Sequence, residues 1–347
     1  MLEKIKIHSV RKLLLTTLVV AFILIIGSTA VMAEADRITV TDSDGYEVEI
    51  DLPVETIVVT SSGINEILVA LGAEDKIIGR DEWSEVSPVL EGQKDIPTVA
   101  SSSFRLQIEA VAELEPDIVI ADTMLQDEAR KKLEIFDIPA IGERTSDAEN
   151  IYNVIRRLAL IVGEEERGEE VISYINDYRT LIKERVADVE EADRPEIFWE
   201  WRGEYQSGSS SSIVQPRIDL INGINIAADA EGDYPELSRE YVIEKNPEIF
   251  IRVESRGTSR EALQKSREKI KNRTGLDQVD AVQNERVYII TQAINTGLAA
   301  IVGDLYFARA AHQEIFADID PHEVYRELYH EFFEMEADET VGYPDDF

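Results

Sequence analysis

The chain has 347 residues, 44% of them hydrophobic and 30% charged, so it can form about two domains, each with a buried core. Its 70 acidic and 35 basic residues give a formal charge of −35, which argues against nucleic-acid binding because phosphate backbones would repel such a chain. The sequence has no cysteine, which excludes a disulfide scaffold, a thiol nucleophile, thiolate metal sites and a lipid-modified N-terminal cysteine.

Residues 1–33 have the pattern of an export signal. Four basic residues precede the apolar run Leu13–Ile26, and Val31-Met32-Ala33 places small residues before a cleavage position. The run can be extended almost to the length of a membrane span, so the segment is either a cleaved signal peptide or a retained N-terminal anchor. We expect an exported, periplasmic or cell-surface protein. Its acidic surface suits an outside, salty medium, and the sequon at Asn272 is compatible with export.

The next segment, residues 34–148, is predicted to form an α/β lobe. Alternating apolar and polar residues on both sides of Asp44-Gly45 indicate a hairpin. A helix is expected at 65–71, where Gly72 ends it. Short apolar runs predict buried parallel strands between helical stretches, at Ile57–Thr60, Ile77-Ile78, Ile118–Ile120 and Ala140-Ile141.

Residues 149–192 show only helical spacing. Apolar residues at intervals of three and four predict one helix from Ile151 to Val162 and a second over roughly Glu166–Val189. The second helix would be ~36 Å long at 1.5 Å per residue, about the diameter of a small domain. It is therefore expected to lie across two lobes.

Strands and helices alternate again in residues 193–347, which predicts a second α/β lobe that ends in acidic helices. Gly223 ends a helix expected at 216–222, and Gly342–Phe347 is expected to be a loose tail. The predicted strands are Ile197–Trp201, Ile249–Arg252 and Val287–Ile290.

An internal repeat supports two similar lobes. The segment Glu109–Ile120 recurs as Glu240–Ile251, with six of its twelve positions identical. In both copies a glutamate precedes a proline by seven residues, and an apolar strand follows. Each copy is a short helix that ends before proline and leads into a buried strand. Two copies on either side of a long helix predict a bilobed protein.

The motifs of several enzyme classes are absent from the sequence. It contains no dinucleotide-binding glycine motif, no P-loop, no zincin motif and no nucleophile elbow. The histidines lack the spacing of a metal-ligand cluster. His8 lies in the predicted signal segment, and we expect the other three on solvated helix surfaces: His312, His322 and His330. These absences favour a protein that is not an enzyme.

The order and spacing of several segments resemble the substrate-binding proteins of ABC importers for iron–siderophore complexes, haem and cobalamin. The resemblance covers the whole mature chain, and its C-terminal part includes Asn222–Asn225, Arg286–Tyr288 and the helix around His312–Phe316. Its N-terminal part rests on Thr39–Asp42, Ile57–Ser61, Glu66–Leu68, Leu71–Ala73, Ile77–Gly79 and Pro116–Ile120. It implies two Rossmann-like α/β lobes with central parallel sheets, joined by one long α-helix, with the ligand in the cleft between them.

The resemblance also implies a docking role for two residues. Glu109 and Glu240 match the glutamates, one per lobe, that bind arginines of the membrane permease. Two exposed carboxylates can each accept charge-assisted bonds from a guanidinium. The simpler alternative is that each is a first-turn glutamate favoured by the helix dipole.

Ligand contacts are expected at the carboxyl ends of the strands, where open parallel sheets form their crevice. Aromatic walls with a few polar groups would suit a large metal chelate, and arginines could pair with its anionic groups. The simpler alternative is that the tryptophans are core residues and the arginines pair with nearby glutamates. The candidates are Ser61, Ser62, Trp83, Ser102, Thr123, Trp199, Trp201, Arg202, Tyr205, Arg252 and Gln292.

These observations predict a monomeric extracytoplasmic receptor that carries a ferric-siderophore-type chelate to an ABC permease and its ATPase subunits, without a cofactor and with modest lobe movement. A cobalamin or haem receptor is the alternative in the same class, with Tyr205 as the candidate axial ligand for haem. A free-metal-ion carrier, which needs a cluster of His, Asp and Glu in the cleft, and an extracytoplasmic sensor or a catalytically repurposed relative remain open.

Overall fold

A computed structural model describes residues 36–101, 105–122, 125–145, 150–337 and 340–344. The chain divides into two units, Met1–Arg37 and Ile38–Phe347. Of the first unit only Asp36 and Arg37 are described, so the predicted signal segment 1–33 lies outside the described residues. The account below concerns the second unit.

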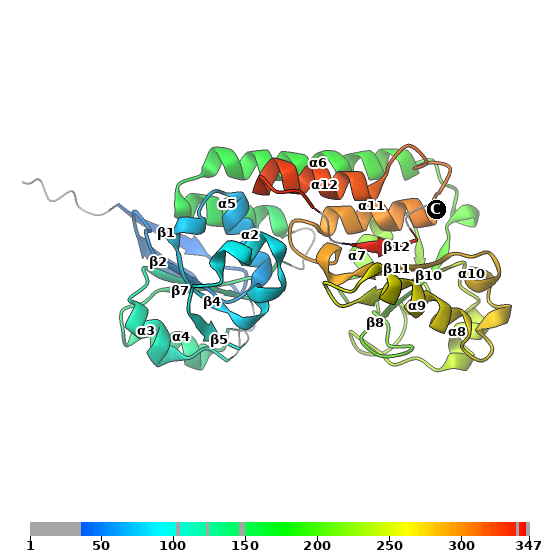
Figure 1. Cartoon of the computed structure of the whole chain (residues 1–347), viewed down its shortest axis with the longest axis horizontal. Helices are drawn as coiled ribbons and strands as arrows, with labels where there is room; N and C mark the ends of the chain where they lie inside the picture. Colours follow the sequence, from blue (N-terminus) through cyan, green and yellow to red (C-terminus); the bar gives the residue numbers. More distant parts are fainter. Residues whose placement is uncertain (1–35, 102–104, 123–124, 146–149, 338–339, 345–347) are drawn as a thin grey trace, which may run out of the picture. The chain divides into compact units, whose positions relative to one another are not determined.

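The N-terminal lobe is built on a five-stranded parallel sheet with the strand order β5-β4-β3-β6-β7 (Figure 1). Four of its strands coincide with the apolar runs from which the sequence predicts strands, whereas β5 is not predicted. A separate two-stranded sheet of β1 (Arg37–Thr41) and β2 (Glu47–Asp51) confirms the hairpin. The five strands are β3 (Ile57–Val59), β4 (Ile77–Asp81), β5 (Thr98–Ala100), β6 (Ile118–Asp122) and β7 (Ala140–Glu143).

Short helices connect these strands and cover the faces of the sheet (Figure 1). A helical segment follows each of these strands along the chain, which is the parallel α/β pattern. The helices are α2 (Ser62–Ala70), α3 (Ile108–Leu114) and α4 (Asp127–Glu134), and the 3-10 segments are η1 (Glu74–Lys76), η2 (Glu82–Val86) and η3 (Pro88–Gln93).

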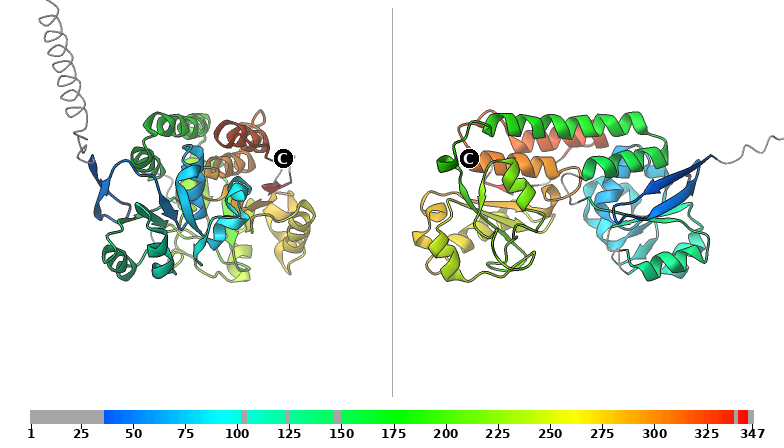
Figure 2. Two further views of the ribbon diagram at one scale, coloured as in Figure 1. Left: turned by 60° about the vertical axis from the view of Figure 1, so that its left-hand side comes forward. Right: turned by 180° about the vertical axis from the view of Figure 1, so that it is seen from behind.

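Two helices join the lobes. Helix α5 (Ile151–Val162) ends at Gly163, whose φ of +80° is a left-handed conformation that glycine adopts without strain. Helix α6 (Glu165–Val186) then runs past elements of both lobes (Figure 2). Near its start Arg167 donates to the Ala70 carbonyl at the end of α2, and near its end Arg185 pairs with Asp318 at 2.5 Å. The predicted long connecting helix is therefore confirmed.

The C-terminal lobe has a second five-stranded sheet with the order β12-β11-β10-β8-β9. Four strands are parallel, and β12 pairs antiparallel with β11. The predicted loose tail at 342–347 is thus wrong for Gly342 and Tyr343, which form this edge strand. The strands are β8 (Glu196–Trp201), β9 (Ile224–Asn225), β10 (Ile249–Glu254), β11 (Val287–Thr291) and β12 (Gly342–Tyr343).

The helices of this lobe lie on both faces of its sheet, and α11 and α12 also pack beside α6 (Figures 1 and 2). The tail is anchored because Tyr306 in α11 donates to the Pro344 carbonyl at 2.7 Å. The helices are α7 (Gln215–Leu220), α8 (Arg239–Lys245), α9 (Arg260–Lys271), α10 (Asp280–Gln283), α11 (Ala300–Ala311) and α12 (Pro321–Phe333), and the 3-10 segments are η4 (Glu191–Asp193), η5 (Leu276–Gln278) and η6 (Gln292–Ile294).

The internal repeat has the same local geometry in both lobes. Helix α3 ends at Glu115 with φ 48° and ψ 53°, and α8 ends at Asn246 with φ 45° and ψ 56°. A proline follows each left-handed cap, and the buried strands β6 and β10 come next. The repeat therefore predicted a real structural correspondence between the lobes.

Candidate functional site

A pocket of about 330 Å³, which we call the cleft pocket, is lined by residues of both lobes. Its N-terminal wall comes from α2 and η2, and its C-terminal wall from the segments that follow β10 and β11. Both walls thus lie at the carboxyl ends of parallel strands, where such sheets form ligand crevices. The lining residues are Ser62, Gly63, Glu66, Trp83, Ser255, Arg256, Gln292, Ala293 and Thr296.

Helix α2 begins at the cleft pocket. Its N-cap is Ser61, whose side chain makes no capping hydrogen bond, and its first turn contains no acidic residue. The backbone N–H groups at a helix start carry a partial positive charge and favour anions. Ser62 and Gly63 of this first turn line the pocket, so the helix presents donors to it.

Trp83 stands on the same wall and is 61% exposed. It belongs to η2, whose N-cap Asp81 accepts a hydrogen bond from the Ser84 backbone at 3.2 Å and from the Ser84 hydroxyl at 2.6 Å. Burial raises the pKa of this Asp81 carboxyl. Asn65 of α2 also donates to Ser84, at 3.3 Å. The backbone that carries Trp83 is therefore fixed while its indole remains open to the pocket.

An ion pair joins the two walls. Arg256 of the C-terminal lobe lies 2.6 Å from the Glu66 carboxylate of α2, and both side chains are largely buried. Glu66 also accepts from the Ser87 hydroxyl at 2.5 Å, and Arg256 donates to the Tyr329 hydroxyl at 2.8 Å. The pair places one positive and one negative group at the cleft, so a charged ligand would compete for one of them.

The end of β11 contributes acceptor and hydroxyl groups to the C-terminal wall. The Oε1 atom of Gln292 and the hydroxyl of Thr291 are buried without a hydrogen-bond partner among the described residues. Such groups cost free energy when they stay unsatisfied. Gln292 lines the cleft pocket, so a bound ligand or water could supply its missing partner.

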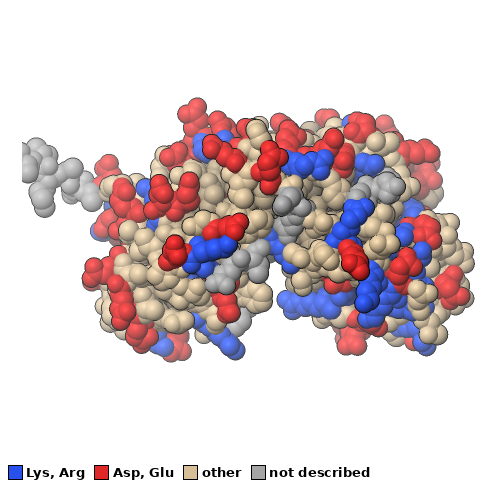
Figure 3. All heavy atoms as spheres, viewed as in Figure 1, with Lys and Arg blue, Asp and Glu red and all other residues tan. Residues whose placement is uncertain are grey.

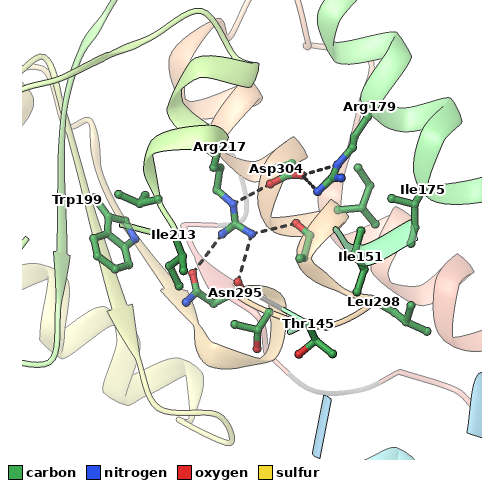
Figure 4. Close-up of a pocket in the computed structure, with 15 residues that line it drawn as sticks. Thr145, Ile151, Ile175, Arg179, Trp199, Ile213, Arg217, Asn295, Leu298 and Asp304 are labelled. Atoms are coloured by element: carbon green, nitrogen blue, oxygen red, sulfur yellow. Dashed lines mark hydrogen bonds and ion pairs between the residues drawn. The ribbon is translucent and has the colours of Figure 1, made fainter. Parts of the chain in front are cut away.

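A smaller cavity of about 30 Å³, the inner cavity, shares Thr296 with the cleft pocket (Figure 4). Beside it, Asp304 accepts from Arg217 at 2.7 Å and lies 3.3 Å from Arg179 of α6. Other lining residues used below are Thr145, Trp199 and Asn295.

The predicted ligand residues fall into four groups. Ser62, Trp83 and Gln292 line the cleft pocket, and Ser61 is the adjacent N-cap. Trp199 is 1% exposed and lines the inner cavity instead. Ser102 and Thr123 lie outside the described residues. The remaining candidates line neither the cleft pocket nor the inner cavity: Trp201, Arg202, Tyr205 and Arg252.

Those four residues surround the end of β8. Trp201 packs between Trp199 and Tyr234, with ring centroids 5.7 and 5.3 Å away, and the Arg202 guanidinium lies 4.1 Å from its ring. Arg252 pairs with the fully buried Glu200 at 3.0 Å. The contacts of Trp199, Trp201 and Arg252 match the simpler alternative of core tryptophans and glutamate-paired arginines, whereas Arg202 lies over the Trp201 ring.

Tyr205 contacts the same buried glutamate, and we call the group of Glu200, Tyr205, Arg252 and Arg273 the Glu200 cluster. The Arg273 guanidinium lies 5.2 Å from its ring and also forms two bonds to Glu200, at 2.6 and 2.8 Å. The backbone N–H of Tyr205 donates to Glu200 at 2.6 Å. Burial raises the pKa of the Tyr205 hydroxyl.

Six residues of the cleft pocket were not predicted: Gly63, Glu66, Ser255, Arg256, Ala293 and Thr296. For two of them a signal was present. Strand β10 continues to Glu254, two residues beyond its predicted end, so the segment that reaches the cleft begins at Ser255. Arg252 and Glu254 alternate with the buried Val253, a period-two pattern that could have been read as continued strand.

The two predicted docking glutamates occupy matching positions. Glu109 is in the first turn of α3 and Glu240 in the first turn of α8, and both are exposed. In Figure 1, both helices lie away from α6, at the opposite side of their lobes. Arg239 pairs with Glu240 at 2.6 Å, and this bond lowers the pKa of the Glu240 carboxyl.

Acidic side chains are spread over both lobes, whereas basic ones gather on the C-terminal lobe around β8 and α9 (Figure 3). This basic region is largely paired. Arg267 and Lys271 contact Glu285 at 2.9 and 2.8 Å, and Lys269 contacts Glu204 at 2.7 Å. Most of its charge is therefore used within the lobe.

Among the described residues, no group of three or more His, Asp or Glu side chains is placed to hold a metal ion. The expectation of surface histidines is wrong for His312, which is only 9% exposed and whose Nε2 lies 2.7 Å from the Ile221 carbonyl. Burial lowers the pKa of this imidazole. No helix in the described part of the chain has the length and apolar character of a membrane span.

Comparisons with known proteins agree with this geometry. A family model described as periplasmic binding protein matches residues 57–294. The chain is 24% identical to the molybdate-binding protein MolA of Haemophilus influenzae, over 89% of this chain and 94% of that protein. It is 25% identical to the vitamin B12-binding protein of Vibrio parahaemolyticus, over 61% of this chain and 73% of that protein.

Solved structures show the same fold. The TM-score is 0.76 to the TroA-like periplasmic binding protein FepB from Veillonella parvula, at 21% identity, covering 88% of this chain and 99% of that one. It is 0.75 to molybdate-bound MolA from Haemophilus influenzae, at 17% identity, covering 87% of this chain and 100% of that one. At these identities the likeness extends to the architecture and not to the ligand.

Proposed function

Because the chain belongs to the periplasmic binding protein family, we propose that it is the extracytoplasmic solute receptor of an ABC importer and that it binds a ferric-siderophore-type chelate. In this role it captures the chelate in the cleft pocket and delivers it to the membrane permease. It performs no covalent chemistry on its ligand.

The observation that carries the proposal is the exposed indole of Trp83 in a pocket with several donors. A tryptophan that is 61% exposed offers a flat apolar surface, which the ligand rings of a metal chelate can cover. The start of α2 and the guanidinium of Arg256 favour the anionic oxygens that such a chelate carries at its rim. Aromatic and cationic groups thus lie in one cleft.

The anchoring of α6 supports modest lobe movement on binding. Its Arg167 and Arg185 are bonded to opposite lobes, and Glu66 and Arg256 link the lobes directly. A wide hinge motion would have to break these contacts. Small-angle scattering curves of the ligand-free and ligand-bound protein should therefore be nearly superimposable, and a large change in the radius of gyration would contradict this part of the proposal.

A corrinoid is the second candidate ligand. The curated relatives named vitamin B12-binding proteins favour it, and the indole of Trp83 could cover a corrin ring as well as a chelate. Haem has less support, because Tyr205, the predicted axial ligand, lies in the Glu200 cluster and does not line the cleft pocket. Molybdate belongs in the same comparison, since one relative is named for it and the pocket is rich in donors.

The proposal is tested by thermal unfolding of the purified protein against ferric hydroxamate, catecholate and citrate chelates, cobalamin, haem, molybdate, and bare Fe³⁺ and Zn²⁺. A ligand at 100 times its Kd stabilises the folded state by about 2.7 kcal/mol, which gives a clear rise in melting temperature. We expect this rise with one ferric chelate. A rise with cobalamin or molybdate alone would replace the chelate assignment, and a rise with bare ions alone would indicate a metal-ion carrier.

Trp83→Ala identifies the site of any shift. It should remove most of the ligand-induced rise and leave the ligand-free melting temperature almost unchanged, because the indole is exposed. Phe136→Ala is a matched control, since Phe136 is 50% exposed and does not line the cleft pocket.

A further inference from the structure

The inner cavity contains two buried donors that lack a partner among the described residues. They are the indole Nε1 of Trp199 and the amide Nδ2 of Asn295, on side chains that are 1% and 5% exposed. Both residues line the cavity. In Figure 4 the two nitrogens lie on the same side of the Arg217 guanidinium. Leaving two buried donors unsatisfied is costly, so the cavity is suited to an occupant that accepts hydrogen bonds.

The orientation of the Asn295 amide is fixed by its neighbour. The Asn295 Oδ1 atom accepts from Arg217 at 3.1 Å, and the Asn295 backbone carbonyl accepts from the same guanidinium at 3.3 Å. A flipped amide would turn its NH₂ group toward the guanidinium, donor against donor. The NH₂ group must therefore face away from Arg217, and Asn295 can offer only N–H donors at that side.

The acceptors of the surrounding network are already used. Asp304 accepts from Arg217 at 2.7 Å, and its other oxygen accepts from Nε and Nη2 of Arg179, each at 3.3 Å. An indole nitrogen has no acceptor capacity. The hydroxyls of Thr145 and Thr296 can rotate to donate as well. The lining therefore offers donors in preference to acceptors, with a guanidinium beside them.

From this arrangement we propose that the inner cavity is a binding site for a small inorganic anion, with a halide as its fitting occupant, held by the Trp199 N–H, the Asn295 amide and the flanking Arg217. A volume of about 30 Å³ admits an occupant of one or two water molecules in size and excludes an organic chelate. A water molecule would need acceptors for its own hydrogens, whereas a halide needs only donors.

The site would link the lobes. Its walls include Thr145, which follows β7 of the N-terminal lobe, Ile175 of the connecting helix α6, and Trp199 of β8 in the C-terminal lobe. An anion bound there stabilises this arrangement independently of any ligand in the cleft pocket. The proposal therefore goes beyond the receptor function and stands or falls separately from the chelate assignment.

The test is thermal unfolding of the full chain at constant ionic strength and constant sodium, with gluconate replaced stepwise by chloride or bromide. We expect a saturable rise in melting temperature that is specific for the halides. A melting temperature that does not depend on halide would overturn the proposal and would indicate that no halide binds in the inner cavity.

Two variants assign the effect to the cavity. Trp199→Phe removes the indole N–H and keeps an aromatic side chain, while Asn295→Asp keeps the acceptor for Arg217 and replaces the donor with a carboxylate oxygen. Each should weaken the halide effect at least tenfold, and Trp201→Phe, outside the cavity, should retain it. Variants that unfold cooperatively in gluconate but keep the full halide response would contradict the assignment.

A bromide-soaked crystal gives a readout that does not depend on the variants folding. Anomalous scattering should place bromide within hydrogen-bond distance of Trp199 Nε1 and Asn295 Nδ2. An anomalous map with no peak in the cavity, at a bromide concentration that saturates the thermal shift, would overturn the proposal.

Discussion

Glu66 of α2 and Arg256 after β10 are 190 residues apart in the sequence, but their Oε1 and Nη1 atoms lie 2.6 Å apart across the cleft. Both side chains are largely buried, so each neutralises a charge that would otherwise be poorly solvated. The pair thus has two roles: it connects the lobes, and it holds the cationic group that an anionic ligand would use.

Glu66→Gln and Arg256→Gln should therefore have the same effect on stability and opposite effects on binding. Each breaks a largely buried ion pair, and we expect the free energy of unfolding to fall by about 3 kcal/mol. Glu66→Gln releases Arg256 from its competitor and should raise the affinity for an anionic chelate several-fold. Arg256→Gln removes the cation and should lower that affinity at least tenfold. Urea unfolding and ligand titration measure the two quantities.

The exposed pair Arg156–Glu169 supplies the control for these variants. Both of its side chains are more than half exposed, so Glu169→Gln should change stability by less than about 1 kcal/mol and leave ligand affinity unchanged. If Glu66→Gln lowered chelate affinity as Arg256→Gln does, the idea of competition for Arg256 would be wrong.

The Glu200 cluster should be important for stability and not for binding. Glu200 is fully buried and accepts from both Arg252 and Arg273. Arg252→Gln removes one of two guanidiniums, so we expect it to lower the urea midpoint while chelate affinity stays within twofold of the wild-type value. A tenfold loss of chelate affinity without loss of stability would indicate instead that Arg252 contacts the ligand.

The sequence predicted the sheets well because their strands are fully buried on both faces. Ile57–Val59 and Ile118–Ile120 are continuous apolar runs, and each is followed by residues typical of turns and helix starts. The same logic located part of the cleft pocket. Ser62, Trp83 and Gln292 lie within a few residues of the ends of the strands β3, β4 and β11, and all three line the cleft pocket.

Contacts between distant segments could not be predicted in this way. Arg252 looked like the end of a strand because a charged residue interrupts the apolar run, but the buried carboxylate of Glu200 on β8 satisfies it and the strand continues. As a result the ion pair between Arg256 and Glu66 was not predicted. Strand β12 has two residues, too few for any alternation, and only its pairing with β11 defines it.

His312 should give the protein an acid-side loss of stability. Burial lowers the pKa of its imidazole in the folded state, with a smaller contribution from the charge of Arg286, below the value of 6.5 expected in the unfolded chain. The unfolded state therefore binds the proton more readily. The contribution of His312 to stability is complete above pH 6.5 and is lost as the pH falls through that value toward the folded pKa.

His312→Gln should flatten this part of the pH profile, because glutamine can donate to the Ile221 carbonyl without titrating. His330→Gln on the exposed side of α12 is the matched control. The measurement is the urea midpoint of each protein between pH 7.5 and about pH 5, relative to wild type. Equal slopes for His312→Gln and wild type would show that another group causes the loss.

The matching glutamates of the repeat should act on transport and not on ligand capture. Glu109 and Glu240 are exposed in the first turns of α3 and α8, and neither lines the cleft pocket. If they dock onto permease arginines, Glu109→Gln with Glu240→Gln removes both charge-assisted contacts and should abolish ligand-stimulated ATPase activity of the reconstituted importer. Ligand affinity and melting temperature should remain those of the wild type.

The control is Glu113→Gln with Glu244→Gln, four residues further along each helix. It tests whether loss of acidic charge alone is responsible, and it should leave the stimulation of ATPase activity intact. If ligand-stimulated ATPase activity survived the substitution of Glu109 and Glu240, these glutamates would only stabilise the N-terminal ends of their helices.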